Sequence, residues 1–449
     1  MKIIQQPSKL VSSLMGQQPY REDIVYRPCH YMVRKRIKSG LLLYHTLTTC
    51  MVLLSHEEEE NLLTNALMAE RWFIVPENYD EQQTCKEIRR IATQLQIKET
   101  TPPNSYIIFT TTDCNARCAY CLEHGITRKH MSAQTAADVA QYIIRHNAGQ
   151  EVSIEWFGGE PLYNASVIDI ICTELKDAGI TFTSTMISNG YLFTDEIIEK
   201  AKNLWHLAGV QITIDGTHDV YNRTKRFIYP QTDAYERVMG NIESIIRAEI
   251  HVGIRMNVTL KNLENYFVLV KELAQRFPDQ RYISMYAQPT MHINKNGDAT
   301  FGTDEASREQ IMQEMERLTT QIAKMGYYRP EPVSDSYRTC CCMADGDRSL
   351  AILPDGQFIK CKERYDKPVG TIYQEELDNN ALQAFKETMT DIPECNTCPL
   401  YPSCIRLKLC VDLRVCYPSR RDCFVRDLQR SMMYTYWKYK NKEKENQTT

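Results

Sequence analysis

The sequence lacks the marks of several large classes of protein. Its 449 residues carry 53 Lys and Arg against 57 Asp and Glu, and this near balance argues against a nucleic-acid partner or a membrane surface. The first residues contain no apolar core of signal-peptide length, and no later run reaches the length of a membrane span. A P-loop, a hydrolase triad and an internal repeat are also missing. We therefore expect a cytoplasmic protein with neither a nucleic-acid nor a membrane partner.

Cysteine, in contrast, is abundant and unevenly placed. Of the 17 cysteines, seven lie in residues 1–339 and ten lie between Cys340 and Cys423. Thiols stay reduced in the cytosol, and an odd count fits a disulfide framework poorly. Metal or iron–sulfur ligation is therefore the leading interpretation. Four remote cysteines are expected to be buried thiols: Cys29, Cys50, Cys85 and Cys172.

Composition divides the chain into four predicted parts. Residues 1–99 form a small α+β module with β-rich and helical segments, which ends at a Thr- and Pro-rich linker. Residues 100–330 form the core of the protein. Residues 331–425 are loop-rich and hold the late cysteines, so metal sites would be needed to maintain their fold. Residues 426–449 indicate a short helix followed by a polar tail.

Residues 100–330 alternate between strand and helix patterns. Repeated units of this kind predict a parallel sheet, and six units are too few for an eight-fold barrel. We therefore predict an α/β fold with a partial (β/α)6 TIM-like barrel. The predicted strands are Tyr106–Thr111, Val152–Phe157, Phe182–Ile187, Val210–Ile214, Val252–Val258 and Tyr282–Ala287. The predicted helices are Ser132–His146, Ala165–Ala178, Thr194–Leu204, Tyr235–Ala248 and Leu263–Arg276.

The loop after the first predicted strand carries three closely spaced cysteines. Cys114, Cys118 and Cys121 follow a C-x3-C-x2-C spacing. Three thiolates on one loop can hold three irons of a cubane cluster, which leaves the fourth iron open to an outside ligand. A zinc site or a purely structural cluster is the alternative for this spacing alone.

Polar and glycine-rich motifs follow at the predicted ends of the next strands. Gly158-Gly159-Glu160 ends the second strand, Ser188-Asn189 ends the third, and Thr213-Ile214-Asp215 ends the fourth. Arg255 lies on the fifth strand. Parallel α/β folds bind ligands at these carboxyl ends, so the motifs are expected to face one site.

Together these motifs resemble those of the radical S-adenosylmethionine (SAM) enzymes, over roughly residues 104–290. The resemblance implies that Cys114, Cys118 and Cys121 hold a catalytic 4Fe-4S cluster whose open iron chelates SAM. A reductant such as flavodoxin or ferredoxin would reduce the cluster, which then cleaves SAM to a 5′-deoxyadenosyl radical. The resemblance also implies a set of SAM-contacting residues: Gly158, Gly159, Glu160, Ser188, Asn189, Thr213, Asp215 and Arg255.

The late cysteines resemble the SPASM extension of a subset of these enzymes, which implies two auxiliary 4Fe-4S clusters and three clusters in all. The pattern departs from the family at Lys408, where a cysteine is usual, so Cys416 is an alternative to Cys410 or Cys423. A zinc ribbon is the alternative at Cys395 and Cys398. The first auxiliary cluster is assigned to one of Cys340, Cys341 and Cys342, here Cys342, with Cys361 and Cys410. The second is assigned to Cys395, Cys398, Cys404 and Cys423.

Enzymes with this extension usually modify peptides or proteins. Residues 1–99 resemble the small winged-helix module with which peptide maturases recognise a precursor, by adding its leader as a strand to a sheet edge. We therefore predict a radical SAM peptide maturase that forms a thioether, a carbon–carbon link or a related oxidation in a ribosomally made precursor. A formylglycine-forming sulfatase maturase and a non-catalytic iron–sulfur electron carrier are alternative functions. A structural cap is the alternative role of residues 1–99.

Overall fold

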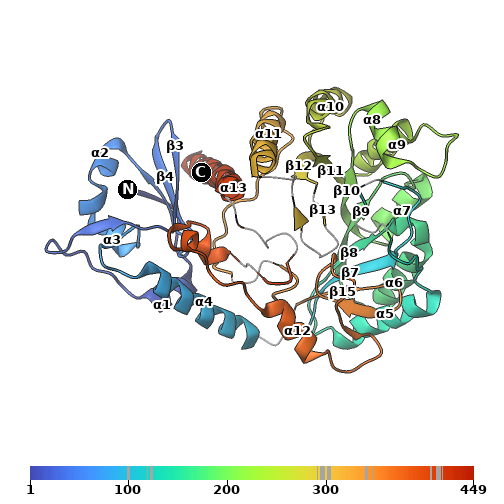
Figure 1. The fold of residues 1–449 in the computed structure, drawn as a ribbon, viewed down its shortest axis with the longest axis horizontal. Coiled ribbons are helices and arrows are strands. Elements are labelled where there is room, and N and C mark those ends of the chain that lie inside the picture. The colour runs from blue at the N-terminus through green and yellow to red at the C-terminus, as the bar shows by residue number, and fades with distance from the viewer. Residues whose placement is uncertain are drawn as a thin grey trace.

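The computed structural model describes residues 1–98, 102–118, 120–121, 125–290, 292–293, 299–300, 305–338, 342–346, 348–404, 407–410, 416 and 418–448. Cys340 and Cys341 lie outside the described residues. Figure 1 shows the N-terminal module on one side, a large α/β sheet with its helices on the other, and C-terminal segments between them. Within the described residues, no helix combines the length and the apolar character needed to cross a membrane.

The N-terminal module is α+β, as predicted. Its main sheet is antiparallel with the order β1-β5-β4-β3, and β2 pairs separately with β6. Ser55 caps helix α2 through a capping box with Glu58. The elements are β1 (Lys2–Gln5), α1 (Lys9–Met15), β2 (Tyr26–Pro28), β3 (Met32–Ile37), β4 (Gly40–His45), β5 (Met51–Leu54), α2 (His56–Glu60), α3 (Ala66–Glu70), β6 (Ile74–Pro76) and α4 (Glu81–Lys98).

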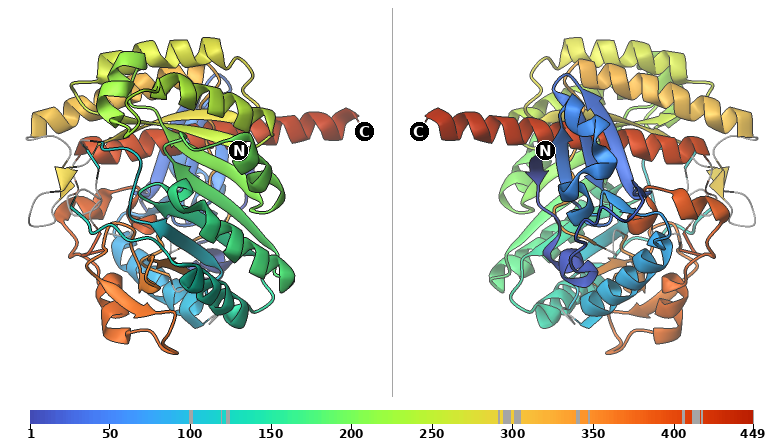
Figure 2. Two further views of the ribbon diagram at one scale, coloured as in Figure 1. Left: turned by 90° about the vertical axis from the view of Figure 1, so that its right-hand side faces the viewer. Right: turned by 90° about the vertical axis from the view of Figure 1, so that its left-hand side faces the viewer.

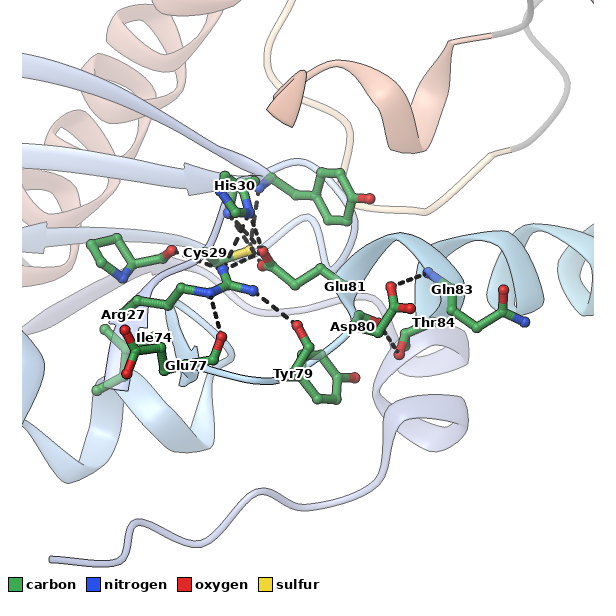
Figure 3. A network of polar contacts seen from close by, with 12 residues as sticks. Arg27, Cys29, His30, Ile74, Glu77, Tyr79, Asp80, Glu81, Gln83 and Thr84 are labelled. Carbon is green, nitrogen blue, oxygen red and sulfur yellow. Dashed lines mark hydrogen bonds and ion pairs between the residues drawn. The ribbon is translucent and has the colours of Figure 1, made fainter. Parts of the chain in front are cut away.

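A buried ion-pair network fixes the start of helix α4 (Figure 3). Glu81 is 6% exposed, and its Oε2 lies 2.6 Å from Nη1 of Arg27 and also contacts Nδ1 of His30. Arg27 also donates to the carbonyl of Tyr79 at 2.9 Å. Because a buried carboxylate is costly without partners, these contacts tie the first turn of α4 firmly to strand β2.

The central part confirms the predicted α/β fold with a partial (β/α)6 barrel. Its six strands are parallel and run in sequence order from β7 to β12, with helices between them. Ser132 and Thr194 cap α5 and α7, as their positions before the helical patterns suggest. The strands are β7 (Ser105–Thr111), β8 (Val152–Gly158), β9 (Phe182–Ser188), β10 (Leu207–Thr213), β11 (His251–Val258) and β12 (Ile283–Pro289). The helices are α5 (Ala133–His146), α6 (Ala165–Asp177), α7 (Asp195–Asn203), α8 (His218–Lys225), α9 (Ala234–Arg247) and α10 (Leu263–Arg276).

The core of this part lies between the sheet and its helices. Ile108, Ile154 and Met186 come from neighbouring strands and are at most 1% exposed. Val139 of α5 and Ile171 of α6 belong to the same buried cluster. The apolar alternation along each strand thus sets which residues face the helices, and it aligns the carboxyl ends of the strands along one edge.

The cysteine-rich part extends the same sheet. Strand β15 pairs in parallel with β7, and the β15–β16 hairpin turns at Asp355-Gly356, as expected. Gly356 has a φ of +81°, which few other residues adopt. The remaining elements are β13 (His292–Ile293), β14 (Ala299–Thr300), α11 (Glu305–Lys324), β15 (Ser349–Ile352), β16 (Gln357–Ile359), β17 (Pro368–Thr371), α12 (Asn379–Lys386) and α13 (Pro418–Thr448), with short 3-10 turns at Pro393–Thr397 and Tyr401–Ser403.

The C-terminal helix is longer than the sequence pattern suggests. Helix α13 runs without interruption from Pro418 to Thr448, where a short helix and a tail were expected, and its far end projects from the body of the protein (Figure 2). No glycine or proline follows Pro418 to break it. Met432 is fully buried against Val33 and Met51 of the N-terminal sheet, so tertiary packing supports the helix.

Candidate active site at the strand ends

The cysteine loop after β7 provides three thiols at the carboxyl edge of the sheet. The Cys114 sulfur accepts hydrogen bonds from the Ala116 amide at 3.3 Å and from Nδ2 of Asn189 at 3.7 Å. Burial raises the pKa of Cys114 to about 12, while the Ala116 hydrogen bond acts in the opposite direction. Cys118 is half-buried and Cys121 is exposed. A bound cation would reverse the effect of burial, because metal coordination deprotonates a thiol.

The donor chemistry of this loop fits an iron–sulfur cluster, although the described side chains do not form a ready-made ligand cage. Within the part of the chain that the structure describes, no group of three or more His, Cys, Asp or Glu side chains is arranged to hold a metal ion. The loop does place N–H donors on the Cys114 sulfur, and hydrogen bonds of this kind stabilise a cluster thiolate.

Glu160 follows β8, and its carboxylate is completely buried. Its Oε1 accepts from the Ser188 hydroxyl at 2.9 Å, and its Oε2 accepts from the Asn189 amide at 2.7 Å. Burial raises the pKa of Glu160 to about 7, against the opposing effect of these hydrogen bonds. The side chain therefore connects the ends of β8 and β9, and its charged form gains stability from any cation that binds nearby.

Asn189 connects the end of β9 to the cysteine loop. Its Nδ2 donates to Oδ1 of Asn115 at 2.7 Å as well as to the Cys114 sulfur. Asn115 is completely buried and was not singled out from the sequence. The predicted motif residues after β7, β8 and β9 thus form one continuous hydrogen-bonded network.

Lys225, at the end of α8, is a site residue that the sequence did not indicate. Its Nζ lies 2.9 Å from Oδ2 of Asp215 and 3.0 Å from the hydroxyl of Tyr120, and Tyr120 also donates to Asp215. Burial disfavours the ammonium, but the charges of Asp215 and Tyr120 outweigh it, so the pKa of Lys225 is raised. The buried lysine joins the cysteine loop to the end of β10.

The remaining predicted contacts lie on β10 and β11. Nε of Arg255 donates to Oδ1 of Asn257 at 3.0 Å, and Nδ2 of Asn257 donates to Asp215 at 3.3 Å. Thr213 is half-buried at the end of β10. Asp215 is engaged by three side chains of the protein itself, and the predicted contacts of Thr213, Asp215 and Arg255 with SAM stay predictions.

Gly158 permits the close approach of β8 to β7. It has a φ of +127°, and a Cβ atom there would lie 2.1 Å from the carbonyl oxygen of Thr111. We expect Gly158→Ala to lower the free energy of unfolding by about 2–4 kcal/mol. Gly149→Ala is the matched control: its φ is +79°, but nothing lies within 4 Å, so about 1 kcal/mol is expected. Denaturant unfolding followed by circular dichroism measures both, and equal losses would contradict the steric argument.

The late cysteines form two neighbourhoods. Burial raises the pKa of Cys361 to about 12, and the charges of Glu363, Cys342 and Cys410 act in the same direction, so these groups lie within electrostatic range of Cys361. Burial also raises the pKa of Cys398, with contributions from Cys416 and Cys395. The assignment of Cys342, Cys361 and Cys410 to the first auxiliary cluster stays a prediction.

Cys423 lies on α13, beside a cavity of about 250 Å3 between β12, α11 and α13. Burial raises its pKa to about 11, and the charge of Asp427 adds to the effect. The charge of Cys416 contributes to the raised pKa of Cys398, so Cys416 stays a candidate for the second auxiliary site beside Cys423. The ligand role of Cys423 stays a prediction.

The strand-end network belongs to a known class of domain. Residues 108–274 match the family model described as the Radical SAM superfamily. The matched residues run from strand β7 to helix α10, and the match agrees with the open sheet of parallel strands whose carboxyl ends carry the cysteine loop.

Individual relatives cover different shares of the chain. The radical SAM cyclopropyl synthase TigE of Paramaledivibacter caminithermalis is 22% identical over 385 residues, which are 79% of this chain and 75% of the relative. The AdoMet-dependent heme synthase of Methanosarcina barkeri is 32% identical over 175 residues, or 36% of this chain and 46% of the relative. The chain therefore matches about half the length of the second relative.

Solved structures share the fold at low sequence identity. The chain covers 100% of anSMEcpe bound to AdoMet and the Cp18Cys peptide, with a TM-score of 0.55, 14% identity and 76% of this chain aligned. It covers 94% of Streptococcus suis SuiB bound to the precursor peptide SuiA, with a TM-score of 0.52, 12% identity and 85% of this chain aligned. These similarities show that the fold extends beyond the matched family model.

Proposed function

We propose that the protein is a radical SAM peptide maturase that modifies a ribosomally made precursor. The observation that carries the proposal is the network at the strand ends, in which Glu160 and Asn189 connect two strand-end motifs to the cysteine loop. A 4Fe-4S cluster with bound SAM, reduced by a flavodoxin or ferredoxin, supplies the abstraction of a hydrogen atom from the substrate. The residues of the chain hold and orient these groups.

Each part of the network has a separate task in this proposal. Cys114, Cys118 and Cys121 ligate the cluster, and the Asn189 amide stabilises the Cys114 thiolate. Glu160 accepts a hydrogen bond from the amino group of SAM, which favours the carboxylate despite its burial. Lys225 fixes the position of the cysteine loop relative to Asp215.

Two auxiliary 4Fe-4S clusters complete the proposed cofactor set. The contributions of Cys342 and Cys410 to the raised pKa of Cys361 support the first of them. The proximity of Cys395 and Cys398 supports the second, with Cys404 and either Cys423 or Cys416 as further ligands. The auxiliary clusters would accept an electron from the substrate after hydrogen abstraction or bind the peptide directly.

The N-terminal sheet offers an edge on which a peptide strand would fit. Strand β3 is an outer strand, and its register with β4 after a two-residue turn directs the N–H and C=O groups of Arg34 and Arg36 away from β4. In agreement, Nε2 of Gln429 donates to the Arg34 carbonyl at 2.8 Å. A leader strand would replace that hydrogen bond, and the exposed Arg34 favours an acidic leader, whereas Arg36 is already paired with Glu59.

Support for a peptide substrate comes from the two structural neighbours, because SuiB and anSMEcpe were each solved with a bound peptide.

The test is co-expression with short peptides encoded beside the gene, followed by mass spectrometry. A product lighter by one pair of hydrogen atoms is the result expected for a cross-link. Unchanged mass with altered chirality would indicate epimerisation, and conversion of a sulfatase Cys or Ser to formylglycine would instead favour a sulfatase maturase. The proposal would be contradicted if every neighbouring peptide and sulfatase remained unmodified.

A further inference from the structure

The loop that carries Cys395, Cys398 and Cys404 consists of consecutive tight turns. The Cys398 amide donates to the Cys395 carbonyl at 3.3 Å, and the Tyr401 amide donates to the Cys398 carbonyl at 3.1 Å. The Cys404 amide then donates to the Tyr401 carbonyl at 3.2 Å. Hydrogen bonds at this spacing place residues i and i+3 on one side of the backbone, so they bring the cysteines together. The same turns have poorer hydrogen-bond geometry than an α-helix and depend on outside support.

Arg89 of helix α4 provides such support from the N-terminal module. Its Nη1 donates to the Tyr401 carbonyl at 2.5 Å and to the Pro402 carbonyl at 3.2 Å. Its Nη2 donates to the Cys404 carbonyl at 2.7 Å, and its guanidinium lies 5.5 Å from the centre of the Tyr401 ring. A planar group with several donors thus fixes three carbonyls of one loop, which a single ammonium would not match.

Two further contacts of the N-terminal module reach the same loop. The Thr46 hydroxyl donates to the Pro399 carbonyl at 2.5 Å, and the Tyr31 ring stacks on the Tyr401 ring with their centres 6.1 Å apart. Tyr31, Tyr401 and Cys395 belong to one buried cluster. The loop of residues 395–404 is therefore packed against the N-terminal module and not only linked to it by one side chain.

Helix α4 is itself held rigidly at its start. The Glu81 network of Figure 3 ties its first turn to strand β2, and Arg89 lies about two turns further along the same helix. The buried side chains Cys85 and Ile88 pack the intervening turns against the module. The position of the Arg89 guanidinium is thus set by the fold of residues 1–98.

We propose that Arg89 is a positioning residue that makes the N-terminal module one wall of the second auxiliary cysteine site. The module then has a part in retaining a cluster, in addition to its proposed recognition of a peptide. This inference rests on the proposed cluster at Cys395, Cys398 and Cys404. Without the guanidinium, three carbonyls lose their donor and the turns that gather the cysteines open.

The test compares Arg89→Ala with Arg90→Ala in the full-length protein. Arg90 is the adjacent residue and is exposed, and its contacts with Glu87 and Gln94 stay within helix α4, which makes it a matched control. After anaerobic reconstitution, Arg89→Ala and Cys398→Ala are both expected to lack about four iron atoms and the electron paramagnetic resonance signal of one cluster. Arg90→Ala is expected to match the wild type.

Hydrogen exchange supplies a readout that needs no metal. Peptides covering residues 395–404 are expected to exchange about tenfold faster in Arg89→Ala than in Arg90→Ala, with or without iron. Equal exchange in the two variants would overturn the inference, whatever their iron content. If the wild type holds no second auxiliary cluster, the proposed cofactor set fails, while faster exchange in Arg89→Ala still supports the positioning role.

Discussion

Cys114→Ala is expected to abolish the formation of 5′-deoxyadenosine when the reduced protein is incubated with SAM. Cys114 is half-buried, and its sulfur receives two hydrogen bonds that suit a thiolate. With one of its three cysteine ligands removed, the cluster is no longer held in the loop. We expect turnover to fall by at least about a thousandfold, with about four iron atoms lost and the auxiliary clusters retained.

The control for this experiment is the same substitution at a cysteine outside the site. Cys172 is completely buried in helix α6, among the apolar residues of the core. Cys172→Ala is expected to cost about 1 kcal/mol of stability, to keep the iron content and to leave SAM cleavage within about twofold of the wild type. Liquid chromatography of 5′-deoxyadenosine measures both variants. Substantial cleavage by Cys114→Ala would contradict the assignment of the cluster.

Local patterns in the sequence were sufficient to predict the barrel and the positions of its motifs. The apolar alternation of β7, β8 and β9 marks strands that end within one residue of their predicted limits, and the glycine and asparagine motifs follow them directly. Parallel strands bring their carboxyl ends to one edge. Residues far apart in sequence, such as Cys114 and Asn189, are therefore neighbours in the structure.

Other parts of the site depended on tertiary structure. Lys225 ends a short polar helix with little periodicity, and lysines are rarely buried, so nothing local indicated that it would contact Asp215. Helix α11 was not predicted either, but its sequence does carry a helical pattern. Ile311, Met315 and Leu318 lie at helical spacing, and all three are buried. The ligand assignment of the late cysteines stayed open because Lys408 stands where the family pattern has a cysteine. The sequence also placed the start of α13 too late, and Cys416 and Cys423 lie on either side of that start.

Glu160→Gln is expected to weaken the binding of SAM about 10–100-fold and to remove the pH dependence of binding. The wild-type carboxylate has a pKa raised by burial to about 7, and a hydrogen bond donated by the amino group of SAM favours its charged form. The affinity of the wild type for SAM should therefore be highest above pH 7. It should fall by about tenfold for each pH unit below 7, as the carboxyl group becomes protonated. The glutamine side chain is neutral at every pH, so the affinity of the variant for SAM should stay at the lower value and should not change with pH.

Equilibrium dialysis of cluster-loaded protein between pH 6 and 8.5 measures this profile, with the unfolding temperature recorded in parallel. Glu174→Gln makes the same substitution on helix α6, where the carboxylate accepts a hydrogen bond from Gln141, and it should keep the wild-type profile. Because glutamine preserves the size of the buried side chain, lost affinity with a retained unfolding temperature attributes the effect to charge. Two results would contradict the proposed hydrogen bond between Glu160 and the amino group of SAM. One is a wild-type affinity that does not change with pH, and the other is a glutamine variant that binds SAM as tightly as the wild type.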